Sequence, residues 1–138
     1  MSESHNEALI RRAIDAWNAN DWNALQELIA PDAELVAPGG WPETGSFKGW
    51  PAVRNLLHGL KEAWSKEHLE IVGVASRGDR VLVEARWYTR GEGSGLDIET
   101  TVWIAYVFEE GRVTRIEFTL EEEAARDAAG IATSGANG

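Results

Sequence analysis

The sequence predicts an α+β fold in which helices pack on one face of a curved antiparallel sheet. The apolar residues first recur with the spacing of helices, and from residue 69 onward they alternate with polar residues as in strands. Helices followed by a run of strands are typical of the α+β class. The 138 residues also include seven tryptophans and no cysteine. Because a buried indole is a large apolar group, this excess predicts a walled, largely apolar cavity inside the sheet.

Three helices are expected before the sheet. Asp21 is a good N-cap for the second helix, which we expect to end before Pro31. Pro51 suits the first turn of the third helix. Their apolar stripes, in order, are Ile10, Ala13, Ile14 and Trp17; Leu25, Leu28 and Ile29; and Val53, Leu56, Leu57, Leu60 and Trp64.

Short runs of strand-forming residues, bounded by turn residues, predict the sheet. Residues 41–49 are expected to form a loop, because proline and glycine recur there. A final helix is expected at 121–129, and Thr119 with Glu122 at its start resembles a capping box. The expected strands are 33–37, 69–75, 80–90, 96–108 and 112–120.

Alternation along the strands separates the two faces of the sheet. The outer face mixes charged residues with Leu82, Tyr88 and Trp103, which favours a homodimer surface over a plain solvated sheet. The more apolar set is expected to face the helices: Val81, Val83, Ala85, Trp87 and Thr89; Ile98, Thr100, Val102, Ile104, Tyr106 and Phe108; and Ile116, Phe118 and Leu120.

Composition narrows the classes of partner. The formal net charge is −10 and the basic residues are scattered, so nucleic-acid binding is not expected. No apolar stretch approaches the ~20 residues of a membrane helix, and the first residues do not form a secretory signal. The lack of cysteine excludes disulfides and thiolate metal sites, which fits a cytoplasmic protein. No other cluster has metal-ligand spacing, and no cofactor is expected.

Several short segments occur in a particular order along the chain. They are NAND at 18–21, APDAE at 30–34, GSFKG at 45–49, GDRVLVE at 78–84, RGEGSG at 90–95 and EGRV at 110–113. No segment is specific by itself, but the series resembles the nuclear transport factor 2-like superfamily, with SnoaL-like and ketosteroid isomerase-like members as the best match. The resemblance implies a cone-shaped α+β barrel, also called cystatin-like, with an internal pocket and commonly a homodimer. We expect one such domain over 1–130 and a flexible tail over 131–138.

The catalytic residues of ketosteroid isomerases are not matched by this chain. Those enzymes use an Asp base that precedes a proline on the first strand, where this chain has Ala37. They also use a Tyr and a protonated Asp as an oxyanion hole, with a further supporting Tyr. The corresponding positions here hold Ala13, Ile104 and Leu57.

Two related chemistries are equally poorly matched. SnoaL-type cyclases and scytalone dehydratases use acid or base residues that include His, and the three histidines here, His5, His58 and His68, are poorly placed for that role. The Asp-Arg-Asp triad of limonene epoxide hydrolases is not recognisable either, because Arg86 is assigned to the outer face.

The expected pocket wall combines tryptophans with inward positions of the helices and strands. Trp41 and Trp50, flanked by glycine and proline, suit a lid that faces the ligand. Trp17 and Trp64 favour plain core filling, and Trp87 suits either role. The full set of expected pocket residues is Trp17, Ala37, Trp41, Trp50, Leu56, Leu57, Leu60, Trp87, Ile98, Thr100, Val102, Ile104, Tyr106 and Phe118.

Three functions remain open at this point. Many inward tryptophans with few inward polar groups, chiefly Thr100 and Tyr106, favour binding of a small hydrophobic molecule, aromatic or polycyclic. A cofactor-independent isomerase, cyclase or lyase is the alternative, with Glu43 as its acid or base, although a solvated loop carboxylate is the plainer interpretation of Glu43. The third possibility is a protein-interaction module with a closed core.

Overall fold

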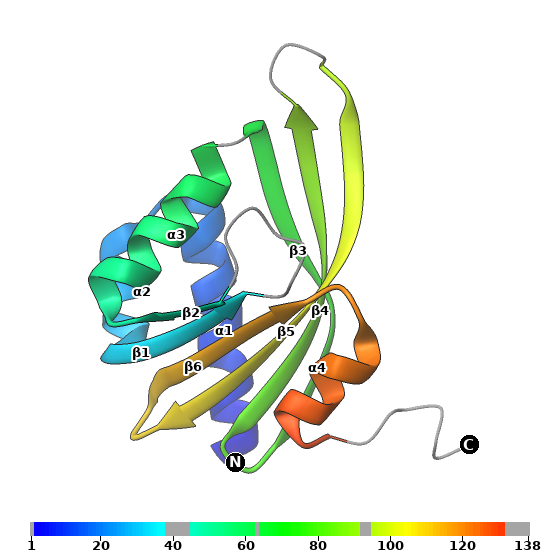
Figure 1. Cartoon of the computed structure of the whole chain (residues 1–138). Helices are drawn as coiled ribbons and strands as arrows, with labels where there is room; N and C mark the ends of the chain where they lie inside the picture. Colours follow the sequence, from blue (N-terminus) through cyan, green and yellow to red (C-terminus); the bar gives the residue numbers. More distant parts are fainter. Residues whose placement is uncertain (1, 38–44, 63, 92–94, 132–138) are drawn as a thin grey trace.

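The computed structural model describes residues 2–37, 45–62, 64–91 and 95–131. Along these residues the chain forms four helices and six strands in the expected α+β class, with one strand more than the five predicted (Figure 1). The expected residues Trp41 and Glu43, and the tail beyond residue 131, lie outside the described part. The elements are α1 (Ser2–Ala19), α2 (Trp22–Leu28), β1 (Ile29–Ala37), β2 (Gly45–Lys48), α3 (Trp50–Glu62), β3 (Trp64–Arg77), β4 (Arg80–Gly91), β5 (Asp97–Glu109), β6 (Arg112–Thr119) and α4 (Glu122–Ala129).

The strands form one curved sheet in the order β2-β1-β6-β5-β4-β3. Strands β3 to β6 form the expected antiparallel meander. The first strand differs from a purely antiparallel sheet, because β1 runs parallel to β6, with Leu35 opposite Ile116. The short β2 then pairs with the free edge of β1.

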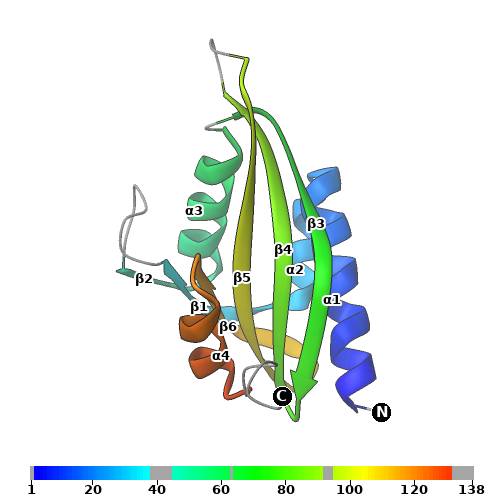
Figure 2. The same cartoon turned by 90° about the vertical axis from the view of Figure 1, so that its right-hand side faces the viewer.

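The sheet bends around the first three helices (Figures 1 and 2). A register shift lies between Ile71 and Gly73 of β3, opposite Ala85 and Glu84 of β4. An extra residue in one strand bends it and increases its twist. The sheet thus curves toward the side on which α1, α2 and α3 lie.

The inner face of the bend carries the main core, and the face assignment from alternation is confirmed there. Val81, Val83 and Ala85 of β4 are completely buried in this core, as are neighbouring side chains of α1 and α3. Leu35 of β1 and Val53 of α3 are also fully buried. The inner face therefore provides the closed apolar interior that the sequence predicts.

A second, smaller core lies on the outer face. There α4 presents Ala125 and Ala129, both fully buried, to Ala105 of β5 and Leu82 of β4. Leu82 is 2% exposed as a result. The outer surface of this chain is thus already partly covered by its own last helix.

Three element boundaries differ from those expected. Ile29 begins β1 instead of ending a helix, residues Gly45–Lys48 form β2 instead of a loop, and Trp64 begins β3 instead of ending α3. In each case a long-range pairing decides the conformation. Ile29 lies opposite Val113, and Trp64 lies opposite Gly91.

The helix ends follow the expected signals in part. The Asp21 carboxylate accepts a hydrogen bond from the Ala24 amide at 3.1 Å, so the predicted N-cap is confirmed. The predicted capping box at Thr119 is wrong, because α4 begins after Glu121, which makes no side-chain cap. The Thr119 hydroxyl accepts instead from the Glu121 amide at 3.1 Å.

No helix among the described residues is long and apolar enough to span a bilayer.

Candidate functional site

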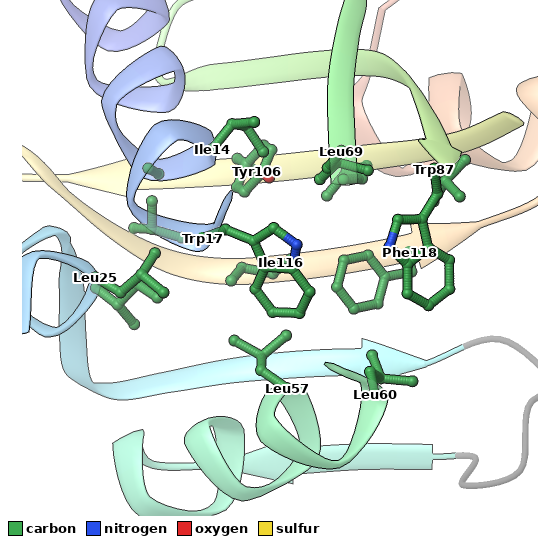
Figure 3. A pocket seen from close by; sticks show the side chains of 15 residues that line it. Ile14, Trp17, Leu25, Leu57, Leu60, Leu69, Trp87, Tyr106, Ile116 and Phe118 are labelled. Carbon is green, nitrogen blue, oxygen red and sulfur yellow. The ribbon is translucent and has the colours of Figure 1, made fainter. Parts of the chain in front are cut away.

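A cavity of about 80 Å³ lies between the inner face of the sheet and the first three helices. Figure 3 shows that side chains from α1, α2, α3 and several strands converge on it. Its described lining consists of aliphatic and aromatic side chains: Ala13, Ile14, Trp17, Leu25, Ile29, Leu57, Leu60, Leu69, Trp87, Val102, Ile104, Tyr106, Val113, Ile116 and Phe118.

Many of the expected pocket residues lie on this wall. They are Trp17, Leu57, Leu60, Trp87, Val102, Ile104, Tyr106 and Phe118. Ala37 and Leu56 are buried in the surrounding core and do not belong to the described lining. Trp50 is buried at the start of α3 beside a separate surface hollow, which Pro31 also lines.

The two expected residues nearest the start of β5 lie differently. Ile98 is 46% exposed, although alternation places it on the inner face. Thr100 is partly buried opposite Trp87 and lies outside the described cavity lining. Alternation determines the side of the sheet, whereas burial depends on a covering element. Ile98 instead lines an open polar cleft together with Trp64 and Asn20.

A carboxylate that the sequence pattern does not distinguish lies between this cavity and the open polar cleft, which it lines. Glu67 of β3 has a side chain that is only 7% exposed. Its Oε1 accepts hydrogen bonds from the indole Nε1–H of Trp17 at 2.8 Å and from that of Trp87 at 2.9 Å. Both indoles line the cavity, so one carboxylate orients two of its walls.

The charge of Glu67 is paired with Lys61, near the end of α3. The Lys61 ammonium contacts the second carboxylate oxygen of Glu67, and the Lys61 side chain is only 10% exposed. It also donates to the Trp17 carbonyl at 2.8 Å and lies 4.0 Å from the centroid of that ring. Each charge therefore has a close partner, which a buried ion pair requires.

Asn18 completes the junction between α1 and β3. Its amide donates to the Leu69 carbonyl at 2.8 Å, and its side-chain oxygen accepts from the Leu69 amide at 2.9 Å. Both hydrogen-bonding groups of one strand residue are thus satisfied by a single side chain. This contact keeps the end of α1, and with it Trp17, against β3.

A sequence signal for Glu67 exists but is weak. Glu67 has the same parity as Leu69 and Ile71, so a strand that starts earlier would place it on the inner face. Glu67 is itself charged and stands between Lys66 and His68, which are also polar. The alternation of apolar and polar residues is therefore visible only from Leu69 onward. Lys61 is polar within an apolar helix stripe and has no distinguishing pattern.

Tyr106 contributes the one hydroxyl of the described cavity lining. It is 6% exposed, and burial raises the pKa of its phenol. Within the described part of the chain, the structure contains no hydrogen bond to this hydroxyl. The Trp17 and Trp87 donors are engaged by Glu67, so Tyr106 is the polar group of this wall that is still available.

Metal ligands and histidines are the other candidate groups, and within the described residues neither is present on the cavity wall. No cluster of His, Asp and Glu there has the geometry of a metal site. His58 lies on the outside of α3, where its Nδ1 is 3.2 Å from a Glu62 oxygen, and His68 packs against Tyr88 on the outer face. Neither histidine lines the cavity.

Glu67→Gln should destabilise the protein. The change leaves the Lys61 ammonium buried without its counter-charge, and we expect the free energy of unfolding to fall by about 3 kcal/mol. Urea unfolding measures it. The control Glu109→Gln, an exposed carboxylate at the end of β5, should cost less than about 0.5 kcal/mol. A Lys61→Met/Glu67→Gln double variant should recover at least half of the loss, and no recovery would refute the pairing.

Tyr106 should make stability depend on alkaline pH. Its raised pKa keeps the folded phenol neutral, whereas in the unfolded chain it ionises near pH 10. The contribution is therefore complete below pH 10 and is lost as the pH rises further. Tyr106→Phe should remove about 1.4 kcal/mol of the stability loss between pH 8 and pH 11. Urea unfolding of both proteins at the two pH values measures this, and an equal loss in both would contradict it.

The comparisons with known proteins agree with this architecture. The chain is similar to Bal32a, from a soil-derived mobile gene cassette, with 22% identity, a TM-score of 0.80 and coverage of 94% of this chain and 98% of that one. It is similar to a candidate polyketide cyclase from Sinorhizobium meliloti, with 28% identity, a TM-score of 0.68 and coverage of 81% and 94%. A candidate SnoaL-like polyketide cyclase from Jannaschia sp. CCS1 has 19% identity, a TM-score of 0.76 and coverage of 92% of each chain.

No curated protein matches the sequence. The SnoaL-like domain family matches residues 10–116, which extend from α1 to β6 and include every side chain of the cavity wall except Phe118. The nuclear transport factor 2-like fold expected from the order of the short segments is confirmed by the solved structures. The chain therefore belongs to the SnoaL-like domain family.

Proposed function

We propose that this protein binds a small apolar molecule in the cavity walled by Trp17, Trp87 and Tyr106. The supporting observation is an apolar cavity of about 80 Å³ in the middle of the main core. Protein interiors are usually packed without voids larger than a water molecule. Filling a cavity of about 80 Å³ with apolar atoms is worth about 2 kcal/mol at roughly 24 cal/mol per Å³. A ligand that fits the cavity gains this free energy.

The volume sets the size of the ligand. Pockets for drug-sized molecules measure about 300–1,000 Å³, and an apolar cavity of about 150 Å³ accepts benzene. About 80 Å³ is therefore too small for the polycyclic ligands expected from the tryptophan content, and we propose a ligand of at most one ring, for which the cavity must widen. Leu60 and Phe118 are only partly buried, so outward movement of these two side chains would enlarge the site.

A proton-transfer or cyclisation enzyme is the second candidate function. It is favoured by the 28% identity with the candidate polyketide cyclase from Sinorhizobium meliloti. Glu43 stays the predicted acid or base for this role, and it lies outside the described residues. Glu67 is a buried carboxylate beside the cavity, but its oxygens already accept from two indoles and Lys61. We therefore assign it a positioning role.

We further propose that two copies associate through the part of the outer sheet face that α4 leaves uncovered. Of the expected contact residues, Leu82 lies under α4 and Trp103 packs beside it. Tyr88 lies outside that cluster, and its hydroxyl donates to Glu70 at 2.9 Å. The proposed dimer therefore centres on Tyr88. The cytoplasmic location stays a prediction.

Sedimentation velocity tests the dimer. The wild type should sediment at twice the chain mass, and Tyr88→Glu should sediment as a monomer, because it places a carboxylate beside Glu70 at the centre of the contact. Leu96→Glu, which removes an exposed apolar residue elsewhere, should stay dimeric. A monomeric wild type at about 100 μM would disprove the proposed contact.

A panel of single-ring and polycyclic hydrocarbons tests the binding proposal. Single-ring compounds should change the tryptophan emission, because Trp17 and Trp87 form the wall, and should raise the melting temperature. Ala13→Leu fills the cavity from α1 and should remove binding without loss of stability. The exposed Ala8→Leu on the same helix is the control and should bind normally.

The same panel distinguishes the three functions. No response to any compound at millimolar concentration would refute ligand binding, and the closed-core interaction module would then be favoured. Chemical conversion of a bound compound, followed by NMR, would favour the enzyme. In that case Glu43→Gln should abolish turnover while binding persists, whereas an unchanged rate would exclude Glu43 as the acid or base.

A further inference from the structure

The strongest unexplained feature of the molecule is the hydroxyl of Tyr106. The ring lies on β5, lines the cavity beside Ile14 and is 6% exposed (Figure 3). The described residues provide this hydroxyl with no hydrogen bond. Buried polar groups in folded proteins are nearly always paired, and leaving one unpaired costs about 1–3 kcal/mol. A hydrogen-bond partner for the Tyr106 hydroxyl would therefore have to be a molecule bound in the cavity.

The other polar atoms near the cavity are already paired. The indole donors of Trp17 and Trp87 both point to Glu67, and the second oxygen of Glu67 contacts Lys61. The remaining described lining residues are aliphatic or are phenylalanine. A molecule inside the cavity thus meets one hydroxyl and an otherwise apolar surface.

This pattern fits an organic ligand better than water. A buried water molecule typically makes about three hydrogen bonds, with a range of two to four. The described wall offers it one partner, so most of the hydrogen bonds of a water molecule would be lost there. An apolar ligand with a single oxygen would pair that oxygen with Tyr106 and place all its other atoms against carbon.

The protonation state of Tyr106 determines which kind of oxygen fits. Burial raises the pKa of this phenol above its ordinary value near 10, so it stays neutral at physiological pH and retains its proton. A neutral phenol can donate a hydrogen bond to an oxygen that has only lone pairs. Carbonyl and ether oxygens are acceptors of this kind.

We propose that Tyr106 determines the specificity of the cavity by donating a hydrogen bond to the single acceptor oxygen of a small cyclic ketone or ether. The inference rests on the proposed binding function and adds the chemical class of the ligand. No covalent step is involved. Tyr106 selects among apolar molecules of equal size, while Trp17 and Trp87 provide the wall.

Two ligands of equal shape test the inference. Cyclohexanone and methylenecyclohexane differ in C=O against C=CH₂, so only the ketone accepts a hydrogen bond. Their dissociation constants are measured by calorimetry with the wild type and with Tyr106→Phe. Within one protein, the ratio of the two dissociation constants also depends on how differently water hydrates the two compounds. This hydration difference is the same for both proteins, so it cancels when the two ratios are compared. We expect Tyr106→Phe to reduce the preference for the ketone about fivefold.

Infrared spectroscopy gives a second readout that a structural role of Tyr106 would not change. The C=O stretch of bound cyclohexanone should lie at lower frequency in the wild type than in Tyr106→Phe, because the hydrogen bond weakens the carbonyl bond. Thr89→Val is the control. It removes another buried hydroxyl, which lies outside the described cavity lining, and should leave the preference and the frequency unchanged.

The outcomes separate this inference from the proposed function. A reduced preference together with a shifted carbonyl stretch supports both. If both compounds bind the wild type and Tyr106→Phe changes neither quantity, the role of Tyr106 is refuted and the apolar site stands. If neither compound binds the wild type at millimolar concentration, the proposed function fails and the inference fails with it.

Discussion

The buried ion pair between Lys61 and Glu67 determines where the wall of the cavity stands. Lys61 lies near the end of α3 and Glu67 on β3, and their shared neighbours Trp17 and Trp87 come from α1 and β4. The two side chains are only 10% and 7% exposed, so either charge alone would be unfavourable here, and the pair holds the four elements together. Both indoles consequently have a fixed orientation. Both rings line the cavity, so their hydrogen bonds to Glu67 fix two parts of its wall.

The polar groups of the site divide into two kinds. At the rim, every donor of the two indoles and both oxygens of Glu67 are paired within the chain. Deep in the wall, Tyr106 is not paired within the described residues. The groups at the rim already have their partners, whereas the Tyr106 hydroxyl can still form a hydrogen bond with a ligand. The fold thus combines a rigid frame with one open position.

The sequence predicts the frame of this protein better than its site. Helical stripes and strand alternation are properties of consecutive residues, so α1, α3 and the inward parity of Val83 and Ile104 follow from local pattern. β2 and the first residues of β3 are strands because they pair with residues that are distant in the sequence. A pattern of consecutive residues carries no information about such pairing. Glu67 was missed for the same reason. A charged residue in a sequence is expected to be exposed, and only the packing of distant elements shows that it is buried. Tyr106 was predicted on the wall because parity alone sufficed.

The parallel pairing of β1 with β6 has a consequence for synthesis of the chain. Leu35 can pair with Ile116 only after most of the chain has been synthesised, because the two residues belong to the first and last strands. Until then β1 has only the short β2 beside it, and the inner apolar residues of both strands stay without their final cover. Contacts this distant along the chain slow folding. During translation the nascent chain therefore exposes the future interior at the ribosome until the last strand emerges, and the cavity is among the last features to form.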